Sequence, residues 1–370
     1  MISAFGIGAH EFGLLIASYS FSAAISGLLA ATFIDRFERK KLLLIVLFLF
    51  SVTTLACGLA SGYPTLLVAR GLSGAFGGVM GALVQTMIGD VIPFVRRAKA
   101  SGVVSTAFGL STVAGVPISL WLANHLQWRA PFIFIALLTW IIILFGLQVL
   151  PQLRHHVRHR PPTHTFEAIF LVVGDGNHLR TLLYSALIIF SGFTVIPYIT
   201  LYAVNNVAIA LEDIPFVYLF GGAATLFTAR LVGYWADLKG KVEVYRLVAF
   251  AAIVPLLVVT HIGVVHLSLW ILCTTVFFVL ISGRMIPAMT IITSAARPSL
   301  RGTFMSLNGT IQSLSMGLAT SLAGFMITQN KGGQIVGYQM VGYVAMIANL
   351  LAIWMVGQIV MHDRQEIGTG

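Results

Sequence analysis

Long apolar runs alternate with short charged or Gly/Pro-containing breaks along the whole chain. Each run is close to the ~20 residues that an α-helix needs to cross the hydrocarbon core of a bilayer. Eleven such runs occur, at residues 13–34, 42–60, 64–89, 101–123, 130–150, 181–203, 215–236, 247–265, 267–293, 303–327 and 337–360. A transmembrane β-barrel would instead show alternating segments of about ten residues. The pattern predicts an all-α membrane protein with about eleven transmembrane helices.

Composition supports this prediction, because 58% of the residues are hydrophobic and only 9% are charged. Soluble domains carry about 25% charged residues, so lipid is the expected surrounding of most of this chain. The two cysteines, Cys57 and Cys273, lie inside apolar runs and indicate neither a disulfide framework nor a metal site. We interpret them as small core residues, and we expect no cofactor.

Basic residues indicate which side of the membrane each break faces, since Lys and Arg are retained in cytoplasmic loops. Seventeen of the 22 lie in alternate breaks, and the other breaks hold only Arg129 and Lys331. The remaining three, Arg70, Arg230 and Arg284, lie within runs. The net charge of +10 is thus explained by membrane topology, which argues against a nucleic-acid partner. The same distribution predicts a cytoplasmic C-terminus.

The two halves of the chain repeat each other. The segment DRFERKK from Asp35 returns as DLKGKVE from Asp237, an offset of 202, and the breaks ending at Arg97 and Arg301 are offset by 204. Parallel duplication of a six-span unit fits both offsets. The second unit has six runs and the first has five, so we expect that one span is absent before Gly13.

This repeat predicts a transmembrane bundle at residues 1–150, a cytoplasmic linker at 151–180 and a six-helix bundle at 181–370. The linker is rich in His and Arg, and we favour a basic loop over a metal tract because Pro161 and Pro162 interrupt it. Apolar residues from Phe166 to Val173 recur at helical spacing. They predict a short helix on the membrane surface.

Two similar motifs end equivalent spans, AATFIDRFERKK in the first half and GYWADLKGK in the second. They resemble the cytoplasmic-loop signature of the major facilitator superfamily, Gly-x-x-x-Asp-Arg-x-Gly-Arg-Lys, although Ala31 and Glu38 stand where the first copy should have glycines. The resemblance covers essentially the whole chain. It implies two six-helix bundles related by a pseudo-twofold axis along the membrane normal.

The resemblance also implies a conformational latch at the cytoplasmic ends of the two halves. Its candidate residues are Asp35, Arg36, Arg39, Asp237 and Lys241. The run from Thr303 begins at the cytoplasm, so the positive end of its helix dipole could accept the carboxylate of Asp35. A solvated loop that follows the charge rule is the alternative, and it explains the basic residues better than the repeated Asp.

Arginines inside apolar runs are candidates for the transport pathway. Arg70 lies in LLVARGLSGAFGGVMGALV and Arg284 in SGRMIPAMTIIT. A cation at the centre of a span costs about 2.5 to 3.5 kcal/mol on insertion scales, so each needs a partner or a water-filled cavity. The pair Arg70 and Gly74 resembles the family's Arg-x-x-x-Gly motif, which implies proton or substrate handling. Snorkelling of Arg70 to the outer surface is the alternative.

Three polar stripes at helical spacing are further candidates for a substrate cavity. They are Tyr19, Ser22 and Ser26; Tyr198, Tyr202 and Asn205; and a third that includes Asn308 and Gln312. Their hydroxyls, amides and rings could hold a sugar or an amphipathic drug. Hydrogen bonding between helices is the alternative for each stripe.

The run STAFGLSTVAGVPISLWLA carries Gly109 and Gly115 on a small-residue face, and Pro117 predicts a bend. Its Gly-Val-Pro resembles the fifth-span signature of antiporters in this superfamily, without the final glycine pair of that signature. Together with the WRAPF segment from Trp128, it resembles most closely the bacterial sugar-efflux permeases, such as those for arabinose, and their drug-exporting relatives. This implies a monomer in the bacterial inner membrane that exports a small molecule in exchange for protons.

Two other functions remain open from the sequence. One is solute import or facilitated diffusion on the same fold, and the other is a non-transporting receptor or a remnant that lacks one span. An enzyme is not indicated, because the sequence contains neither a phosphate-binding loop nor a nucleophile elbow. Acidic residues are nearly absent from the runs, so proton coupling rests on the resemblance.

Overall fold

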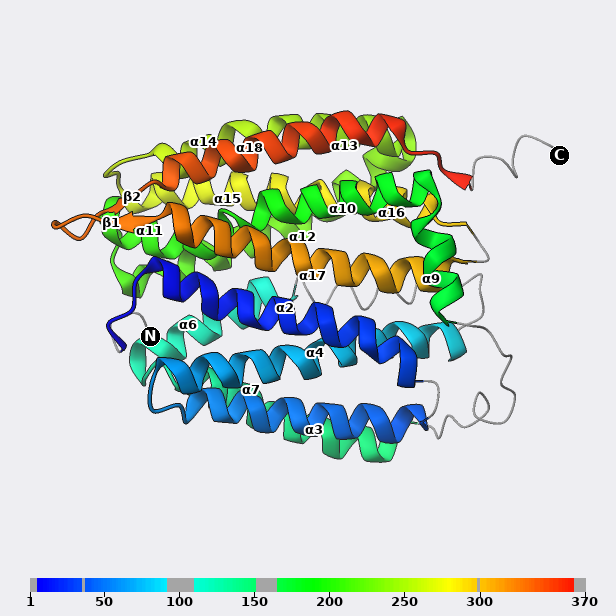
Figure 1. The fold of residues 1–370 in the computed structure, drawn as a ribbon. Helices are drawn as coiled ribbons and strands as arrows, with labels where there is room; N and C mark the ends of the chain where they lie inside the picture. Colours follow the sequence, from blue (N-terminus) through cyan, green and yellow to red (C-terminus); the bar gives the residue numbers. More distant parts are fainter. Residues whose placement is uncertain (1–4, 35–36, 92–109, 151–164, 298–299, 363–370) are drawn as a thin grey trace.

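Two bundles of nearly parallel helices form the protein in a computed structural model that describes residues 5–34, 37–91, 110–150, 165–297 and 300–362 (Figure 1). The first bundle contains α2 (Ala9–Phe33), α3 (Arg39–Gly58), α4 (Tyr63–Val91), α6 (Val116–His125) and α7 (Ala130–Val149). The second contains α10 (Gly176–Phe193), α11 (Ile199–Asn206), α12 (Ile214–Lys239), α13 (Lys241–Ala251), α14 (Ile253–His261), α15 (Leu267–Gly283), α16 (Met285–Ala295), α17 (Arg301–Met326) and α18 (Tyr338–Met355).

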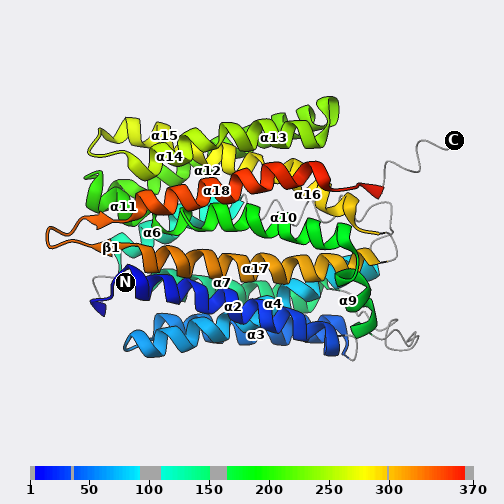
Figure 2. The same ribbon diagram turned by 45° about the horizontal axis from the view of Figure 1, so that its top comes forward.

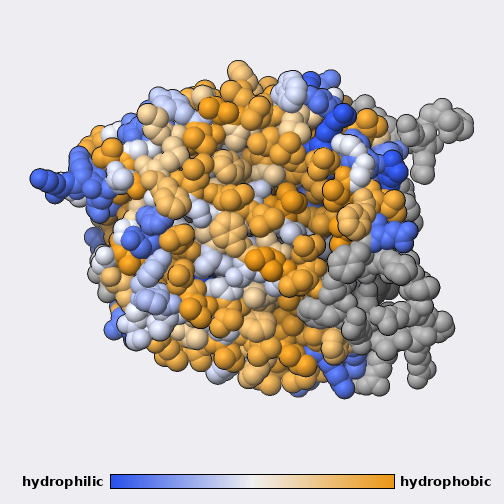
Figure 3. Space-filling model, in the orientation of Figure 1, coloured by the Kyte–Doolittle hydropathy of each residue, from blue (hydrophilic) through white to orange (hydrophobic). Residues whose placement is uncertain are grey.

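The helices have the length and surface of membrane spans. Within the described ranges, nine helical segments are long and apolar enough to cross a bilayer. Figure 3 shows hydrophobic residues over the middle of one face and hydrophilic residues gathered at its two ends. Such an apolar surface is stable against lipid and not against water. The prediction of an all-α membrane protein is therefore confirmed.

Each of the eleven predicted runs contains a helix, but two are not among the nine. The run at 101–123 is described only from residue 110, where a short π-helical segment, Ser111–Gly115, precedes α6. The run at 303–327 forms the 26-residue α17, whose many Gly, Ser and Thr residues lower its hydropathy. The lower hydropathy of α17 has a structural reason: this helix packs between other helices, so only part of its surface faces lipid.

Capping and proline residues set the ends of the helices. The span predicted at 181–203 occupies Gly176–Asn206, because the Asp175 side chain accepts hydrogen bonds from the first N–H groups of α10 and starts the helix earlier. Pro197 lies in the 3₁₀ turn Ile196–Tyr198 that separates α10 from α11. A second break divides α15 from α16 at Arg284, three residues before Pro287.

Two seams join the bundles, one between α2 and α17 and the other between α12 and the segment formed by Ser111–Gly115 and α6. The sequence offset of about 200 residues makes α2 equivalent to α12 and α6 equivalent to α17. Each seam therefore joins the same pair of repeat elements, as a pseudo-twofold axis requires. Figures 1 and 2 both show α17 lying between α2 and α10.

Glycines let α2 and α17 approach closely. A Cβ atom on Gly13 would lie 2.9 Å from the Thr320 carbonyl oxygen, and one on Gly317 would lie 2.8 Å from the Phe21 ring. A Cβ on Gly324 would meet the Tyr198 hydroxyl at 2.8 Å. Because real Cβ atoms do not fit at such distances, this seam depends on glycine at these positions.

Short elements close the two ends of the bundle. At one end, β1 (Thr328–Gln329) and β2 (Ile335–Val336) form an antiparallel hairpin. At the other end, α9 (Thr165–Val173) runs across the helix axes (Figure 1). It occupies the place where the sequence predicts a surface helix, with Phe170 and Leu171 exposed and Val172 buried. Its contact with a membrane surface stays a prediction.

Candidate functional site

The first polar centre lies between α2 and α4. The Arg70 guanidinium of α4 lies over the Tyr19 ring of α2, 4.9 Å from its centroid, which is cation–π distance. Arg70 is half-buried. A Cβ on Gly74 would lie 2.7 Å from the Tyr19 backbone, so glycine at this position permits the approach. The helices thus bring together Arg70, Tyr19 and Gly74, three residues that the sequence singles out.

The other residues of the Tyr19 stripe also face α4. The Ser22 hydroxyl would lie 3.5 Å from a Cβ on Gly71, and Ser26 lies against Gly78. Ser26 donates to its own helix, at Ala23 O (3.3 Å). The stripe therefore lies at the α2–α4 crossing, where it contributes both to packing and to the polar surroundings of Arg70.

The second polar centre surrounds Arg284 in the C-terminal bundle. Arg284 is only 1% exposed at the α15–α16 break. Its Nη2 donates to the Ile188 carbonyl oxygen at 3.1 Å, and Nη1 donates to Asn349 Oδ1. Ser191 Oγ lies 3.4 Å from both Nη atoms. The guanidinium thus links α10, α18 and the α15–α16 joint.

Several buried polar groups around Arg284 complete this centre. Asn349 is fully buried and also donates to the Ala249 carbonyl oxygen of α13 at 2.7 Å. The Tyr184 and Tyr245 rings lie 5.1 Å apart near Arg284. Their hydroxyls and Arg284 Nε are buried without hydrogen-bond partners among the described residues. Sequence reasoning missed these neighbours, although a lone asparagine inside an apolar run was a usable signal for Asn349.

Neither Arg70 nor Arg284 has a carboxylate partner in the part of the chain that the structure describes. A buried cation without a counter-charge is costly, and neutral acceptors offset only part of that cost. Both bundles therefore contain a positive centre within their spans. These centres are able to attract negative charge or hydrogen-bond acceptors.

The α17 stripe faces α10. Gln312 Nε2 donates to Ser185 Oγ at 3.0 Å. Asn308, one helical turn away, is 2% exposed, and its Oδ1 is buried without a partner within the described segments. An unsatisfied buried amide in a membrane bundle is an unusual feature that a ligand or a water could satisfy.

The Tyr198 stripe lies in the core of the C-terminal bundle. The Tyr198 hydroxyl donates to the Thr320 carbonyl oxygen (2.8 Å), and the Tyr202 hydroxyl donates to the Ile262 carbonyl oxygen (2.9 Å). Asn205 donates within its own helix, to Leu201 O. Both tyrosines are fully or almost fully buried. These contacts fit the interhelical alternative better than a cavity lining.

The latch and the predicted bend are described only in part. Asp35, Arg36 and Gly109 lie outside the described residues. Arg39 is buried and donates to the Ile34 carbonyl oxygen at 2.6 Å. Gly115 ends the π-helical segment, and Pro117 lies in the first turn of α6. Asp237 and Lys241 flank Gly240, whose φ of +97° allows the turn from α12 into α13. The latch itself remains a prediction.

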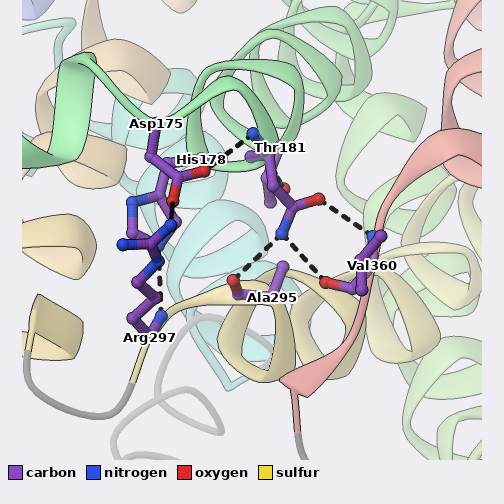
Figure 4. Close-up of polar contacts among 7 residues, drawn as sticks. Asp175, His178, Thr181, Ala295, Arg297 and Val360 are labelled. Atoms are coloured by element: carbon purple, nitrogen blue, oxygen red, sulfur yellow. Dashed lines mark hydrogen bonds and ion pairs between the residues drawn. The ribbon is translucent and has the colours of Figure 1, made fainter.

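A third polar cluster, which sequence reasoning missed, holds the start of α10 and is shown in Figure 4. Asp175 accepts from the N–H groups of Asn177 (2.8 Å) and His178 (3.1 Å) and pairs with Arg297 Nη2 at 2.5 Å. The Asn177 side chain donates to Ala295 O (3.3 Å) and Val360 O (2.9 Å) and accepts from Val360 N–H. We call these residues, together with His178, the α10 clamp.

His178 and Asp175 give the clamp its electrostatics. His178 is 0% exposed, and its Nε2 accepts from the backbone N–H of Arg297 at 3.1 Å. Partial burial raises the pKa of Asp175, but the two N–H donors and the nearby positive charge outweigh that effect and hold the pKa below its ordinary value. The signal in the sequence was Asp175 followed by Gly-Asn-His, an N-cap pattern.

Metal ligands do not gather in the described part of the chain, which contains no group of three His, Cys, Asp or Glu able to hold an ion. Cys57 and Cys273 are free thiols there, and Cys57 Sγ lies 3.7 Å from Ser73 Oγ. Cys57 is buried, in keeping with the interpretation as a small core residue.

Two duplicated bundles with positive centres inside their spans define a polytopic membrane protein of the secondary-transporter class. A family model described as the Major Facilitator Superfamily matches residues 1–320, so the chain belongs to that family. The predicted fold is thereby confirmed. The homologues and structural neighbours are transporters, not enzymes, and members of this family bind small-molecule substrates within the membrane.

Similar curated proteins come from Bacillus subtilis strain 168. The MFS-type transporter YfhI is 24% identical over 267 residues, 66% of this chain and 64% of YfhI. YhcA is 27% identical over 179 residues, 48% of this chain and 33% of YhcA. The multidrug transporter protein MdtP is 31% identical over 123 residues, 32% of this chain and 23% of MdtP. The matched stretches thus span less than two-thirds of these relatives.

Solved structures agree on the fold. A bacterial homologue of the human lysosomal transporter Spinster, crystallised in an inward-facing and occupied conformation, superimposes with a TM-score of 0.71. Its sequence is 15% identical, and the match covers 97% of this chain and 90% of that one. At this identity, the likeness concerns the architecture alone.

Proposed function

We propose that the protein is a proton-coupled exporter of a small sugar or drug-like molecule that works by alternating access. The observation that carries this proposal is the pair of positive centres, Arg70 in one bundle and Arg284 in the other, inside spans of a duplicated transporter fold. The antiporter-like run ending in Pro117 and the relatives named multidrug transporter protein and multidrug resistance protein 2 support export.

In this proposal the bundles rock about the two seams around a solute at midplane depth. Arg70, with Tyr19, supplies a cation and a ring from the N-terminal bundle. Arg284 supplies a donor group from the C-terminal bundle, and Asn308 Oδ1, which has no partner among the described residues, supplies an acceptor. Ser22, Ser26, Gln312 and Asn205 add polar contacts, and Tyr198 and Tyr202 position the helices. Closure at one end would involve the latch residues.

The membrane arrangement follows from the charge distribution. We infer a monomer in a bacterial cytoplasmic membrane, with bundles at 1–150 and 181–370 and a linker at 151–180 on the cytoplasmic side together with the C-terminus. α9 would lie in the headgroup region of that side, since its exposed Phe170 and Leu171 are apolar. Finer assignment to the sugar-efflux branch rests on the Gly-Val-Pro variant at Gly115 to Pro117.

Transport by the purified protein in liposomes would test the proposal. A panel of radiolabelled sugars and fluorescent drug-like cations, anions and neutral molecules is offered to vesicles with and without an imposed pH gradient. We expect uphill movement of one solute class in exchange for protons, and its loss when a protonophore collapses the gradient. Movement of solute with the proton would favour an importer, and equal flux without a gradient would favour a facilitator.

Three arginine variants connect the activity to the site. Arg70→Ala and Arg284→Ala should lower transport at least tenfold, because each removes a cation that lies within a span, half-buried for Arg70 and buried for Arg284. Arg230→Ala is the matched control, since Arg230 also lies within a span, on α12, but is exposed. We expect it to transport like the wild type. Normal transport by both Arg70→Ala and Arg284→Ala would contradict the site assignment.

A further inference from the structure

The α10 clamp joins three segments that are distant in the sequence. It connects the start of α10 to the end of α16 through Ala295 and Arg297, and to the segment after α18 through Val360 (Figure 4). α9 and the linker lead directly into Asp175. The clamp therefore fixes the point at which the connection between the two bundles enters the C-terminal bundle.

His178 is held in one protonation state by this geometry. Its Nε2 accepts a hydrogen bond from the Arg297 N–H, so Nε2 carries a lone pair and the ring is neutral with its proton on Nδ1. Nδ1 is buried, and the Val172 backbone acts on it as a hydrogen-bond acceptor. A protonated imidazole donates from both nitrogens, so it cannot accept from Arg297.

We propose that His178 is a proton-binding site and that its protonation opens the α10 clamp. Binding of one proton removes the Nε2 lone pair and places two N–H donors against each other. The Arg297 N–H then lacks its acceptor, and the segment after α16 is held to α10 only by the Asp175–Arg297 ion pair and the Asn177–Ala295 hydrogen bond. The ordinary pKa of histidine is about 6.5, so a ring released from the clamp takes up a proton below about that pH.

The groups that face His178 decide the sign of the effect. Asp175 attracts an imidazolium, but its carboxylate is already bonded to the Arg297 guanidinium at 2.5 Å and to two backbone N–H groups. Arg297 and His362, the latter from the segment after α18, both oppose a positive ring. α17 contributes the uncharged Phe304 ring at 5.0 Å. α9 contributes Val172, whose backbone carbonyl accepts from the ring and favours a proton on it. The clamp is therefore complete when His178 is neutral and loses the His178 contact as the pH falls.

This proton site does not depend on the identity of the transported solute. Loss of the His178 contact would loosen the start of α10, where α9 enters the bundle and where Asn177 holds the segment around Val360. Acidification on that side would then weaken the mechanical connection between the bundles. A transporter that failed every assay of the proposed function could still show this response, and the reverse also holds.

Hydrogen exchange of the full-length protein in lipid nanodiscs tests the proposal. Exchange is compared between about pH 8 and about pH 5.5 for peptides that cover 294–297 and 356–362, in the wild type and in His178→Gln. Glutamine keeps an acceptor for the Arg297 N–H but cannot bind a proton. Comparison of the same peptide at the same pH cancels the intrinsic pH dependence of exchange. In the wild type we expect the equilibrium constant for opening of the α10 clamp to rise by up to tenfold per pH unit below about pH 6.5. In His178→Gln it should stay constant.

Two further measurements keep the outcome decisive if His178→Gln packs poorly. Arg297→Ala retains the backbone donor but removes a charge that opposes the imidazolium and occupies Asp175, so it should keep a pH-dependent opening that is weaker than in the wild type. Nitrogen-15 NMR of labelled histidine, with the His178 signal identified by its loss in the variant, should show a neutral ring with protonated Nδ1 at about pH 8 and a charged ring at about pH 5.5. Either a His178 ring that stays neutral at about pH 5.5 or an equal pH response in His178→Gln would overturn the proposal.

Discussion

Replacement of Asn349 by leucine perturbs the Arg284 centre while keeping the side-chain volume similar. The wild-type amide accepts from Arg284 Nη1 and donates to the Ala249 carbonyl oxygen. A hydrogen bond to a charged group contributes about 1.5 to 3 kcal/mol, and an ordinary interhelical one in a membrane about 0.6 kcal/mol. We therefore expect Asn349→Leu to lower the free energy of unfolding by about 2 to 3.5 kcal/mol.

Asn308→Leu is the matched control in the same bundle. Asn308 is equally buried, but its Oδ1 has no partner among the described residues, so the leucine removes an unsatisfied group. We expect a change within about 1 kcal/mol, of either sign. Steric trapping in bicelles measures the unfolding free energy of both variants. Equal losses in the two, or a loss below about 1 kcal/mol in Asn349→Leu, would refute the reasoning about the buried guanidinium.

Three further predictions concern packing, pH and topology. Gly74→Leu should cost about 1 to 3 kcal/mol or more by overpacking the α2–α4 crossing, whereas Gly81→Leu, with open space around its Cβ, should cost nothing measurable in a thermal unfolding assay. The groups that lower the pKa of Asp175 stabilise the folded protein fully at pH values above the ordinary pKa of aspartate. This stabilisation is lost as the pH falls through the lowered pKa. Asp175→Ala should therefore cost about 1 kcal/mol near pH 7 and progressively less in acid, and a loss independent of pH would contradict the ion pair. Cysteines placed at the exposed Lys239 and Lys331 should react with impermeant maleimide from opposite sides of the membrane, and labelling from the same side would rule out the predicted topology.

Arg70 and Arg284 could be identified as candidates from the sequence because a cation in an apolar run has few explanations. The side chains that surround these arginines could not be identified from the sequence. The partners of Arg284 include Asn349 and Ser191, which are 65 and 93 residues away in the chain. Helical periodicity identifies the face of a helix but not the helix that it meets. The polar centre around Arg284 therefore became visible only with the packing of α10, α13 and α18.

The other differences between the sequence-based predictions and the structure arise where helices start or break. The sequence places His178 in a polar linker, whereas the Asp175 cap starts α10 before it and buries its ring against Phe304. The stripe of Tyr198 and Tyr202 follows Pro197, where the structure has a 3₁₀ turn, and both hydroxyls bond to backbone carbonyls of distant segments instead of lining a cavity. Such short-range geometry overrides a pattern that is read over a longer window.

Of the glycine contacts between α2 and α17, the one between Gly13 and the Thr320 backbone lies near the start of α2, whereas the one between Gly317 and Phe21 lies at its middle. From Gly13, which touches the Thr320 backbone, α2 continues for 20 residues to Phe33, a length of about 30 Å at 1.5 Å per residue. A rotation of about 10° at that point would carry the far end of the helix by about 5 Å. A small rotation at the contact between Gly13 and Thr320 would thus move the far end of α2 by a distance comparable to the width of a sugar ring.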